Sequence, residues 1–208
     1  MAITLKPFRQ YDEHDVINMF TYDVDATVTS GVQALAGTIV TTTSGGWKAG
    51  DDIHDLSATQ PNAAVNGNSY GNTLSLRYNL LAEVVAFAGT TDDGLTAQQP
   101  LGMLLNDVRT LDENGEDLRY NPRKADEMQV VVPGQAVPIV TRGIFLLHAN
   151  DTTTNNATDL ASVTAGEKIT VDANGHISDA GDGSDVNIGK ALGDWDASTN
   201  TVLIKLEL

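Results

Sequence analysis

Short segments in which apolar and polar residues alternate recur along most of this chain. The clearest is the last one, residues 201–208, which reads Thr-Val-Leu-Ile-Lys-Leu-Glu-Leu. Every second residue from Val202 to Leu208 is apolar, whereas Lys205 and Glu207 lie on the opposite face of an extended chain. A period of two is typical of a half-buried strand. The chain is therefore expected to end in a core strand, with its final residue in the core.

Comparable apolar segments predict further strands, and polar segments between them predict loops. The expected strands are residues 37–43, 74–88 (one strand or two short ones), 101–108, 128–132, 136–140 and 143–148. The expected loops are residues 57–73, 90–99 and 149–162. About eight to ten short strands separated by turns are typical of an antiparallel sandwich or barrel. We therefore predict an all-β fold, an antiparallel β-barrel or β-sandwich.

Turn residues divide these strands into hairpins. Asn114-Gly115, between expected strands at residues 108–111 and 118–120, favours a tight type I′ turn, because both central residues of that turn need positive φ. Pro133-Gly134 and Asn174-Gly175 mark two further hairpins. Because proline cannot donate to a strand ladder, Pro138 predicts an edge strand or the first residue of a strand.

Residues 1–36 show neither a clear helical period nor a clear strand period. This segment contains the aromatic residues Phe8, Tyr11, Phe20 and Tyr22 among acidic residues. We predict an extended N-terminal arm over residues 1–36 that packs on something else, followed by the β-barrel or sandwich domain over residues 37–208. The alternative is that the segment supplies a first strand or short helix of the same domain.

Two segments resemble each other within the chain. Residues 101–107 and 188–194 both fit the pattern apolar-Gly-x-x-Leu-x-Asp, and Ala49–Ile53 resembles Ala165–Ile169. A glycine inside a strand permits the bend or bulge that closes a small barrel. The similarity indicates a barrel with related halves, although matches this short do not define a repeat protein.

The composition excludes several classes of function. With 28 acidic and 12 basic residues, the formal net charge is −16, so a phosphate backbone would be repelled and nucleic-acid binding is not expected. The chain has no cysteine, which excludes disulfides, thiolate metal sites and cysteine nucleophiles. No apolar run approaches the roughly 18 residues that a membrane span needs, so no membrane contact is expected.

The order of segments in the C-terminal part carries a family resemblance. Residues 132–143 read Val-Pro-Gly-Gln-Ala-Val-Pro-Ile-Val-Thr-Arg-Gly, and Ala165-Gly-Glu-Lys-Ile, Ile188-Gly-Lys-Ala-Leu and Thr201-Val-Leu-Ile-Lys-Leu follow. This order resembles the β-tulip-type decoration (cement) proteins of tailed-phage capsids. Residues 100–120 also resemble structural proteins of large tailed phages.

The resemblance implies a non-enzymatic protein without a cofactor, made in the host cytoplasm and located on the outer capsid surface of the virion. It implies homotrimers at three-fold and quasi-three-fold positions, in contact with the major capsid protein. Candidate residues for docking to the capsid or for the trimer contact are aromatic and arginine residues. They are Phe8, Arg9, Tyr11, Phe20, Tyr22, Arg109, Arg119 and Arg123.

The basic residues among these candidates permit a second interpretation. Together with Lys124, the arginines between residues 109 and 123 place four of the twelve basic residues within one short stretch, which is the least acidic surface available for an acidic partner. The alternative is local ion pairing with nearby acidic residues. Those residues are Asp107, Asp112, Glu116, Asp117 and Asp126.

Other kinds of site have weaker support. Asp179, Asp182 and Asp185 could bind calcium in a glycine-rich loop, although a solvated turn explains them better. The four histidines are scattered, and no serine has a nucleophile-elbow context. A hydrolase would need carboxylates that converge from separate strands. A glycan- or receptor-binding β-sandwich module of a virion fibre or cell surface is the alternative function, with residues 57–73 and 149–162 as its loops and Tyr70 as their sole aromatic residue.

Overall fold

The computed structural model describes residues 3–23, 31–42, 82–87, 99–149, 160, 162–171, 175–179 and 186–208. The described chain is mostly strand, with one α-helix, so the predicted all-β fold is confirmed. The strands are β1 (Ile3–Gln10), β2 (Val16–Tyr22), β3 (Val32–Ala34), β4 (Ile39–Thr42), β5 (Ala82–Ala86), β6 (Gly102–Leu104), β7 (Val108–Arg109), β8 (Val137–Val140), β9 (Arg142–Ala149), β10 (Lys168–Val171), β11 (Ile177–Asp179), β12 (Val186–Ala191) and β13 (Thr201–Glu207). The helices are the 3-10 turns η1 (Glu13–Asp15) and η3 (Leu118–Tyr120) and the α-helix α2 (Pro122–Met128).

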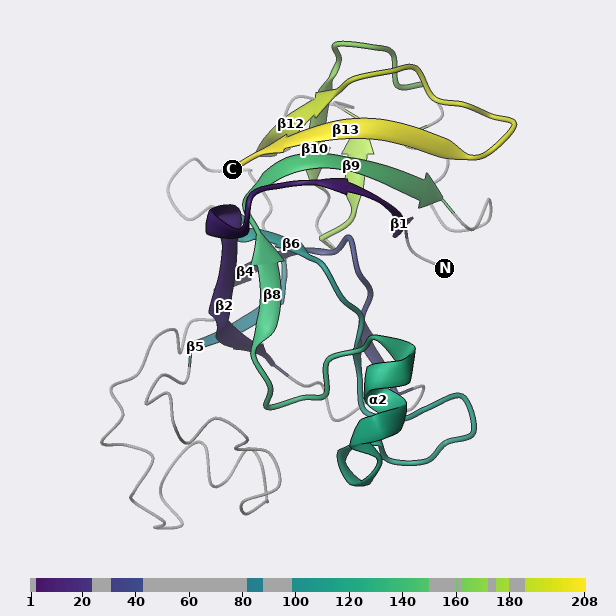
Figure 1. Ribbon diagram of the computed structural model, residues 1–208. Coiled ribbons are helices and arrows are strands. Elements are labelled where there is room, and N and C mark those ends of the chain that lie inside the picture. The colour runs from purple at the N-terminus through teal and green to yellow at the C-terminus, as the bar shows by residue number, and fades with distance from the viewer. Residues whose placement is uncertain are drawn as a thin grey trace.

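The strands form two main bodies, one above the other in Figure 1. The upper body is a six-stranded antiparallel sheet in the order β1-β9-β13-β12-β10-β11. The lower body is a closed barrel, β2-β5-β4-β6-β8, and β3 pairs separately with β7. α2 lies below the barrel, far from the sheet (Figure 1). The barrel closes through the parallel pair β2–β5, whereas its other pairs are antiparallel.

The two bodies share one apolar core. A single cluster of buried side chains joins Ile39 and Met103 of the barrel, and Phe87 directly after β5, to Phe145 and Ile188 of the sheet. A second cluster joins barrel residues, among them Val40, Val84 and Ile139, to Ala34 of β3 and Val108 of β7. The predicted alternation in the last strand is confirmed, since Val202, Ile204 and Leu206 of β13 are buried, the residues between them are more exposed, and Leu208 packs against the shared core. β13 lies between β9 and β12, inside the sheet.

The barrel and the sheet repeat one topology. We call β2, β4, β5, β6 and β8 the first half, and β9 to β13 the second half. In both halves the first strand pairs with the fifth, the fifth with the fourth, the fourth with the second, and the second with the third. The corresponding registers agree: Met103↔Ile39 matches Lys190↔Lys168, Leu104↔Ile139 matches Ala191↔Ile204, and Thr41↔Val85 matches Thr170↔Ser178.

Hydrogen bonds outside the strands repeat as well. Gly37 donates its N–H to Leu104 O at 2.8 Å, as Gly166 does to Ala191 O at 2.9 Å. The two segments of the pattern apolar-Gly-x-x-Leu-x-Asp therefore occupy corresponding places, residues 101–107 in the first half and 188–194 in the second. The halves differ at closure: β2 pairs with β5, whereas β9 pairs with β1 instead of β11.

Residues 1–36 do not form an arm separate from the domain where the structure describes them. β1 belongs to the sheet, β2 to the barrel, and β3 pairs with β7. The physical reason is burial, because Ile17 and Phe20 of β2 pack against the barrel core. The segment therefore follows the alternative interpretation, in which it supplies strands of the same domain.

The hairpin predicted across Pro133-Gly134 is wrong. Residues 122–128 form α2, with Pro122 in its first turn, and β8 pairs with β2 and β6. Proline at the first helical position has a favourable φ, and the residues that follow it in α2 are mostly good helix formers. Pro138 therefore lies in a strand with neighbours on both sides. The register of β2 shifts between Ile17 and Phe20, opposite Pro138, so a bulge accommodates the missing donor.

Two other sequence expectations are partly met. The segment 101–108 is interrupted, because β6 ends at Leu104 and β7 begins at Val108. A turn forms at Asn114-Gly115, with φ +83° at Gly115, but Asn114 lacks the positive φ that the predicted type I′ turn needs. η3 then follows where a strand was expected. The hairpin around Gly175 is confirmed by the antiparallel pair β10–β11, and the predicted strand at residues 143–148 lies within β9.

Candidate functional site

The predicted docking residues do not lie on one surface. Arg9 lies on β1, and Tyr11 follows that strand. Tyr22 is 7% exposed and Phe20 packs against the barrel core, so these two serve the fold rather than a surface. Phe8 is a β1 residue whose side chain lies outside the described part of the chain.

Arg9 and Tyr11 lie where the chain passes from the sheet to the barrel. The Arg9 Nη1 group donates to Leu105 O at 3.1 Å. The Tyr11 ring stacks on Phe145, with ring centroids 6.0 Å apart and planes 21° apart, and the residue is 41% exposed. Beside them, Thr141 donates its N–H to Asp15 O at 2.9 Å, which ties together the two points where the chain crosses between the bodies.

β1 is an edge strand with an interrupted ladder. Ile3 to Leu5 pair with Ala149 to Leu147, and Arg9 and Gln10 pair with Phe145 and Ile144. The register shifts between these two stretches, where Pro7 lies. No described strand pairs with the outer edge of β1. A proline and a bulge limit how an edge strand can pair with other chains.

The four basic residues of the stretch 109–124 all have acidic partners. Arg109 pairs with Asp107 at 3.2 Å, Arg119 with Asp117 at 2.6 Å, Arg123 with Glu127 at 3.3 Å, and Lys124 with Asp112 at 2.7 Å and Glu113 at 3.2 Å. Three of these partners, Asp107, Asp112 and Asp117, are among those named for local pairing. The geometry therefore favours local pairing over a free positive surface.

Asp112 is the centre of the turn that precedes α2. Its Oδ1 accepts the N–H of Asn114 at 2.7 Å and of Glu116 at 2.8 Å, and its side chain is fully covered. The hydrogen bond from Lys124, together with these backbone donors, lowers the pKa of Asp112 to about 2, and the same contact raises the pKa of Lys124. Asp112 stabilises this turn as a carboxylate, because all of these partners favour its charged form.

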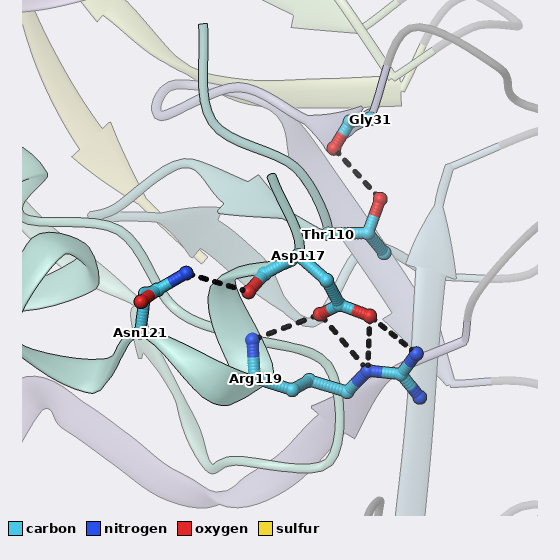
Figure 2. Close-up of polar contacts among 5 residues, drawn as sticks. All are labelled: Gly31, Thr110, Asp117, Arg119 and Asn121. Atoms are coloured by element: carbon cyan, nitrogen blue, oxygen red, sulfur yellow. Dashed lines mark hydrogen bonds and ion pairs between the residues drawn. The ribbon is translucent and has the colours of Figure 1, made fainter. Parts of the chain in front are cut away.

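Residues 110–136 form a small lobe below the barrel, which we call the α2 lobe (Figure 1). Leu118, Ala125 and Val132 are its core. Figure 2 shows how η3 is fixed within it: Arg119 Nη2 donates to Asp117 Oδ2 at 2.6 Å, and the Arg119 N–H donates to Asp117 Oδ1 at 2.9 Å. Thr110 Oγ1 donates to Gly31 O at 3.2 Å, which attaches the lobe to the residues before β3 (Figure 2).

Tyr120 is the most exposed large apolar side chain in the described part of the protein. It is 80% exposed, and the guanidinium carbon of Arg119 lies 5.9 Å from the centre of its ring. Beside it is a surface hollow of about 350 Å³, lined by Tyr120, Asn121, Pro122, Arg123, Lys124 and Glu127. The hairpin expected around Asn114-Gly115 would place Tyr120 in a strand, so that expectation does not predict this site. The Asn121-Pro122 pair was the available signal, because Asn-Pro favours a turn.

No described residues form a metal site of three or more His, Asp or Glu side chains. Asp182, Asp185 and the side chain of Asp179 lie outside the described residues, so the expected solvated turn, with calcium binding as its alternative, stays a prediction. The loops expected at 57–73 and, for most of its length, 149–162 also lie outside them. Within the described chain, no helix has the length and apolar character needed to cross a membrane.

Comparisons with known proteins do not assign this chain to a family. No protein-family model matches it, and neither the curated proteins nor the solved structures contain a significant match.

Proposed function

We propose that this chain is a structural virion protein that binds the outer surface of a tailed-phage capsid and stabilises the head. In this proposal it acts without catalysis or a cofactor, as a homotrimer at three-fold and quasi-three-fold positions, in contact with the major capsid protein. The sequence resemblance suggests the role, and the edge position of β1 is the structural observation that supports it best.

The outer edge of β1 suits a contact with an extended segment of another chain. Among the described strands β1 pairs with β9 alone, so its outer row of backbone N–H and C=O groups has no strand partner in the described part of the chain. An extended segment can add to such an edge through main-chain hydrogen bonds. The interruption at Pro7 leaves two short stretches, so the edge suits a short, specific segment rather than unlimited association. Arg9 and Tyr11 add side chains of types that are enriched at protein interfaces.

The body behind this edge suits a protein that resists strain. The chain passes from β1 to β2 through η1, and from β8 to β9 through Thr141. Thr141 Oγ1 donates to Asp15 O at 3.1 Å, and the two bodies share one core. A load applied to β1 is therefore distributed over both the sheet and the barrel.

A binding assay with phage heads tests the proposal. Heads that lack this chain are mixed with the purified protein and sedimented, and the bound protein is measured. We expect the wild type to sediment with the heads and Arg9→Glu combined with Tyr11→Ala to bind at least about tenfold more weakly, which corresponds to about 1.4 kcal/mol. Arg123→Glu, a charge change on the α2 lobe, is the control. Failure of the wild type to bind any heads would overturn the proposal.

A further inference from the structure

We infer that the α2 lobe contains a carbohydrate-binding site centred on Tyr120, which takes a neutral sugar. This site lies on a different part of the molecule from the β1 edge, and it does not depend on the proposed capsid role. Four features of the lobe support the inference: its place in the repeated topology, its rigidity, the exposed ring, and the balance of charges around it.

The lobe is an addition to the repeated topology. In the second half, the corresponding connection to the last strand is a short turn at residues 196–200, in which Asp196 donates its N–H to Thr201 O at 3.0 Å. The first half uses residues 110–136 at the same place, between β7 and β8. The second half thus forms the same strand pairing without a lobe. The α2 lobe is therefore not needed for that pairing, which indicates that it has another role.

The lobe holds Tyr120 in a fixed position. Leu118, directly before Arg119, is 1% exposed, and the lobe core also contains Ala125 at 5% and Val132 at 2%. Arg119, beside the ring, is itself held by Asp117 through both its backbone and its side chain. The exposure of Tyr120 is therefore a feature of a packed element rather than of a frayed end.

An exposed aromatic ring beside a polar hollow is the arrangement that sugar recognition uses. The face of an aromatic ring is electron-rich and attracts the weakly positive C–H groups of a pyranose. The hollow of about 350 Å³ adds the amide of Asn121, the guanidinium of Arg123 and the carboxylate of Glu127 around the ring. These groups supply both hydrogen-bond donors and acceptors, and each sugar hydroxyl can use both.

The balance of charges favours a neutral ligand over an anionic one. Arg123 lies 3.3 Å from Glu127, and Lys124 pairs with Asp112 and Glu113, so each of these cations already has a carboxylate partner. A phosphate or an acidic peptide would meet the same carboxylates. Arg123 and Glu127 are 93% and 66% exposed, and an ion pair this exposed contributes little to stability. The Arg123 guanidinium and the Glu127 carboxylate can therefore turn towards sugar hydroxyls with little loss of stability.

The test is binding of the whole protein to a printed array of neutral and acidic glycans, followed by calorimetric titration with the best neutral oligosaccharide. We expect the wild type to bind neutral glycans and Tyr120→Phe, which keeps the ring, to bind within about threefold of it. Tyr120→Ala should lose about tenfold or more in affinity, which is about 1.4 kcal/mol. Tyr11→Ala, at an exposed tyrosine on the other surface, should bind as the wild type does.

Three results would overturn the inference: no glycan bound by the wild type, binding confined to acidic glycans, or equal binding by Tyr120→Ala and the wild type. Head binding by Tyr120→Ala is measured in parallel. Normal head binding together with lost glycan binding separates the two functions. Lost head binding with unchanged glycan binding would show that Tyr120 is a protein contact and that the carbohydrate assignment is wrong.

Discussion

The carboxylate of Asp194 accepts a hydrogen bond from the backbone N–H of Ala165 at 2.8 Å. Asp107 accepts one from Ala36 at 2.9 Å at the corresponding place in the other half. In each case the carboxylate fixes the turn that precedes the second strand of its half, β10 or β4. The last residue of the pattern apolar-Gly-x-x-Leu-x-Asp thus has the same role twice in one chain.

Replacing this aspartate should destabilise the protein. We expect Asp194→Ala to lower the free energy of unfolding by about 1 kcal/mol, because a charge-assisted hydrogen bond to a backbone donor is lost. Asp194→Asn keeps an acceptor and should lose less. Urea unfolding gives the values, and Asp126→Ala, on the exposed side of α2, is the control. Equal stabilities of Asp194→Ala and Asp126→Ala would contradict the role of this bond.

The glycine of the same pattern should be irreplaceable in both halves. A Cβ at Gly102 would lie 2.7 Å from Val140 O, and a Cβ at Gly189 would lie closer still to Lys205 O. Gly102→Ala and Gly189→Ala should each cost about 2–3 kcal/mol, because a backbone atom has to move. Gly193→Ala, where a Cβ would meet no atom within 4 Å, is the matched control. Chemical denaturation of the three variants tests this, and a wild-type midpoint for Gly189→Ala would refute the close approach.

Deletions from the N-terminus should separate the contributions of the first two strands. Without residues 1–10 the protein loses β1, which pairs with one strand, β9, in the described part of the chain, and we expect it to remain folded. Without residues 1–23 it also loses β2, which joins β5 to β8 in the barrel. We expect that shorter chain to lose its cooperative thermal transition in circular dichroism. A folded chain that begins at residue 24 would mean that the barrel closes without β2.

Acid should destabilise the α2 lobe through Asp112. Its pKa in the folded protein is about 2, below its ordinary value of 3.8. A group whose pKa is depressed on folding stabilises the protein above its unfolded-state pKa and loses this effect as the pH falls. The urea midpoint should therefore decrease between about pH 4 and pH 2. Asp112→Asn should be less stable at pH 6 and show a smaller decrease, whereas Asp126→Asn should follow the wild type. A parallel decrease in Asp112→Asn would contradict this assignment.

The sequence predicted those elements whose periodicity is local. Apolar segments predict β13 and β9, and turn residues within a few positions predict the β10–β11 hairpin. The internal similarity between residues 101–107 and 188–194 is visible in the sequence, but the second expected match, of Ala49–Ile53 with Ala165–Ile169, is wrong. Ala36-Gly37, rather than Ala49-Gly50, corresponds to Ala165-Gly166, since Gly37 and Gly166 both have positive φ and make matching hydrogen bonds. The correspondence depends on which strand lies opposite, and a single sequence does not contain that information.

The candidate site was less predictable than the fold. Arg119 and Arg123 are notable in the sequence as charges, but their meaning depends on Asp117 and Glu127, which a short helix and a 3-10 turn bring within reach. Tyr120 has the alternating neighbours of a strand residue, and only the formation of η3 and α2 turns it outward. Short helices of this kind depend on capping contacts and packing more than on any long period.

The molar ratio of this chain to the major capsid protein in density-purified virions of the source culture tests the central proposal most directly. A lattice decoration predicts a ratio of about one chain per capsid subunit, because every equivalent position on a symmetric shell can be filled. Absence of the chain from purified virions, or a few copies per particle, would contradict the decoration role.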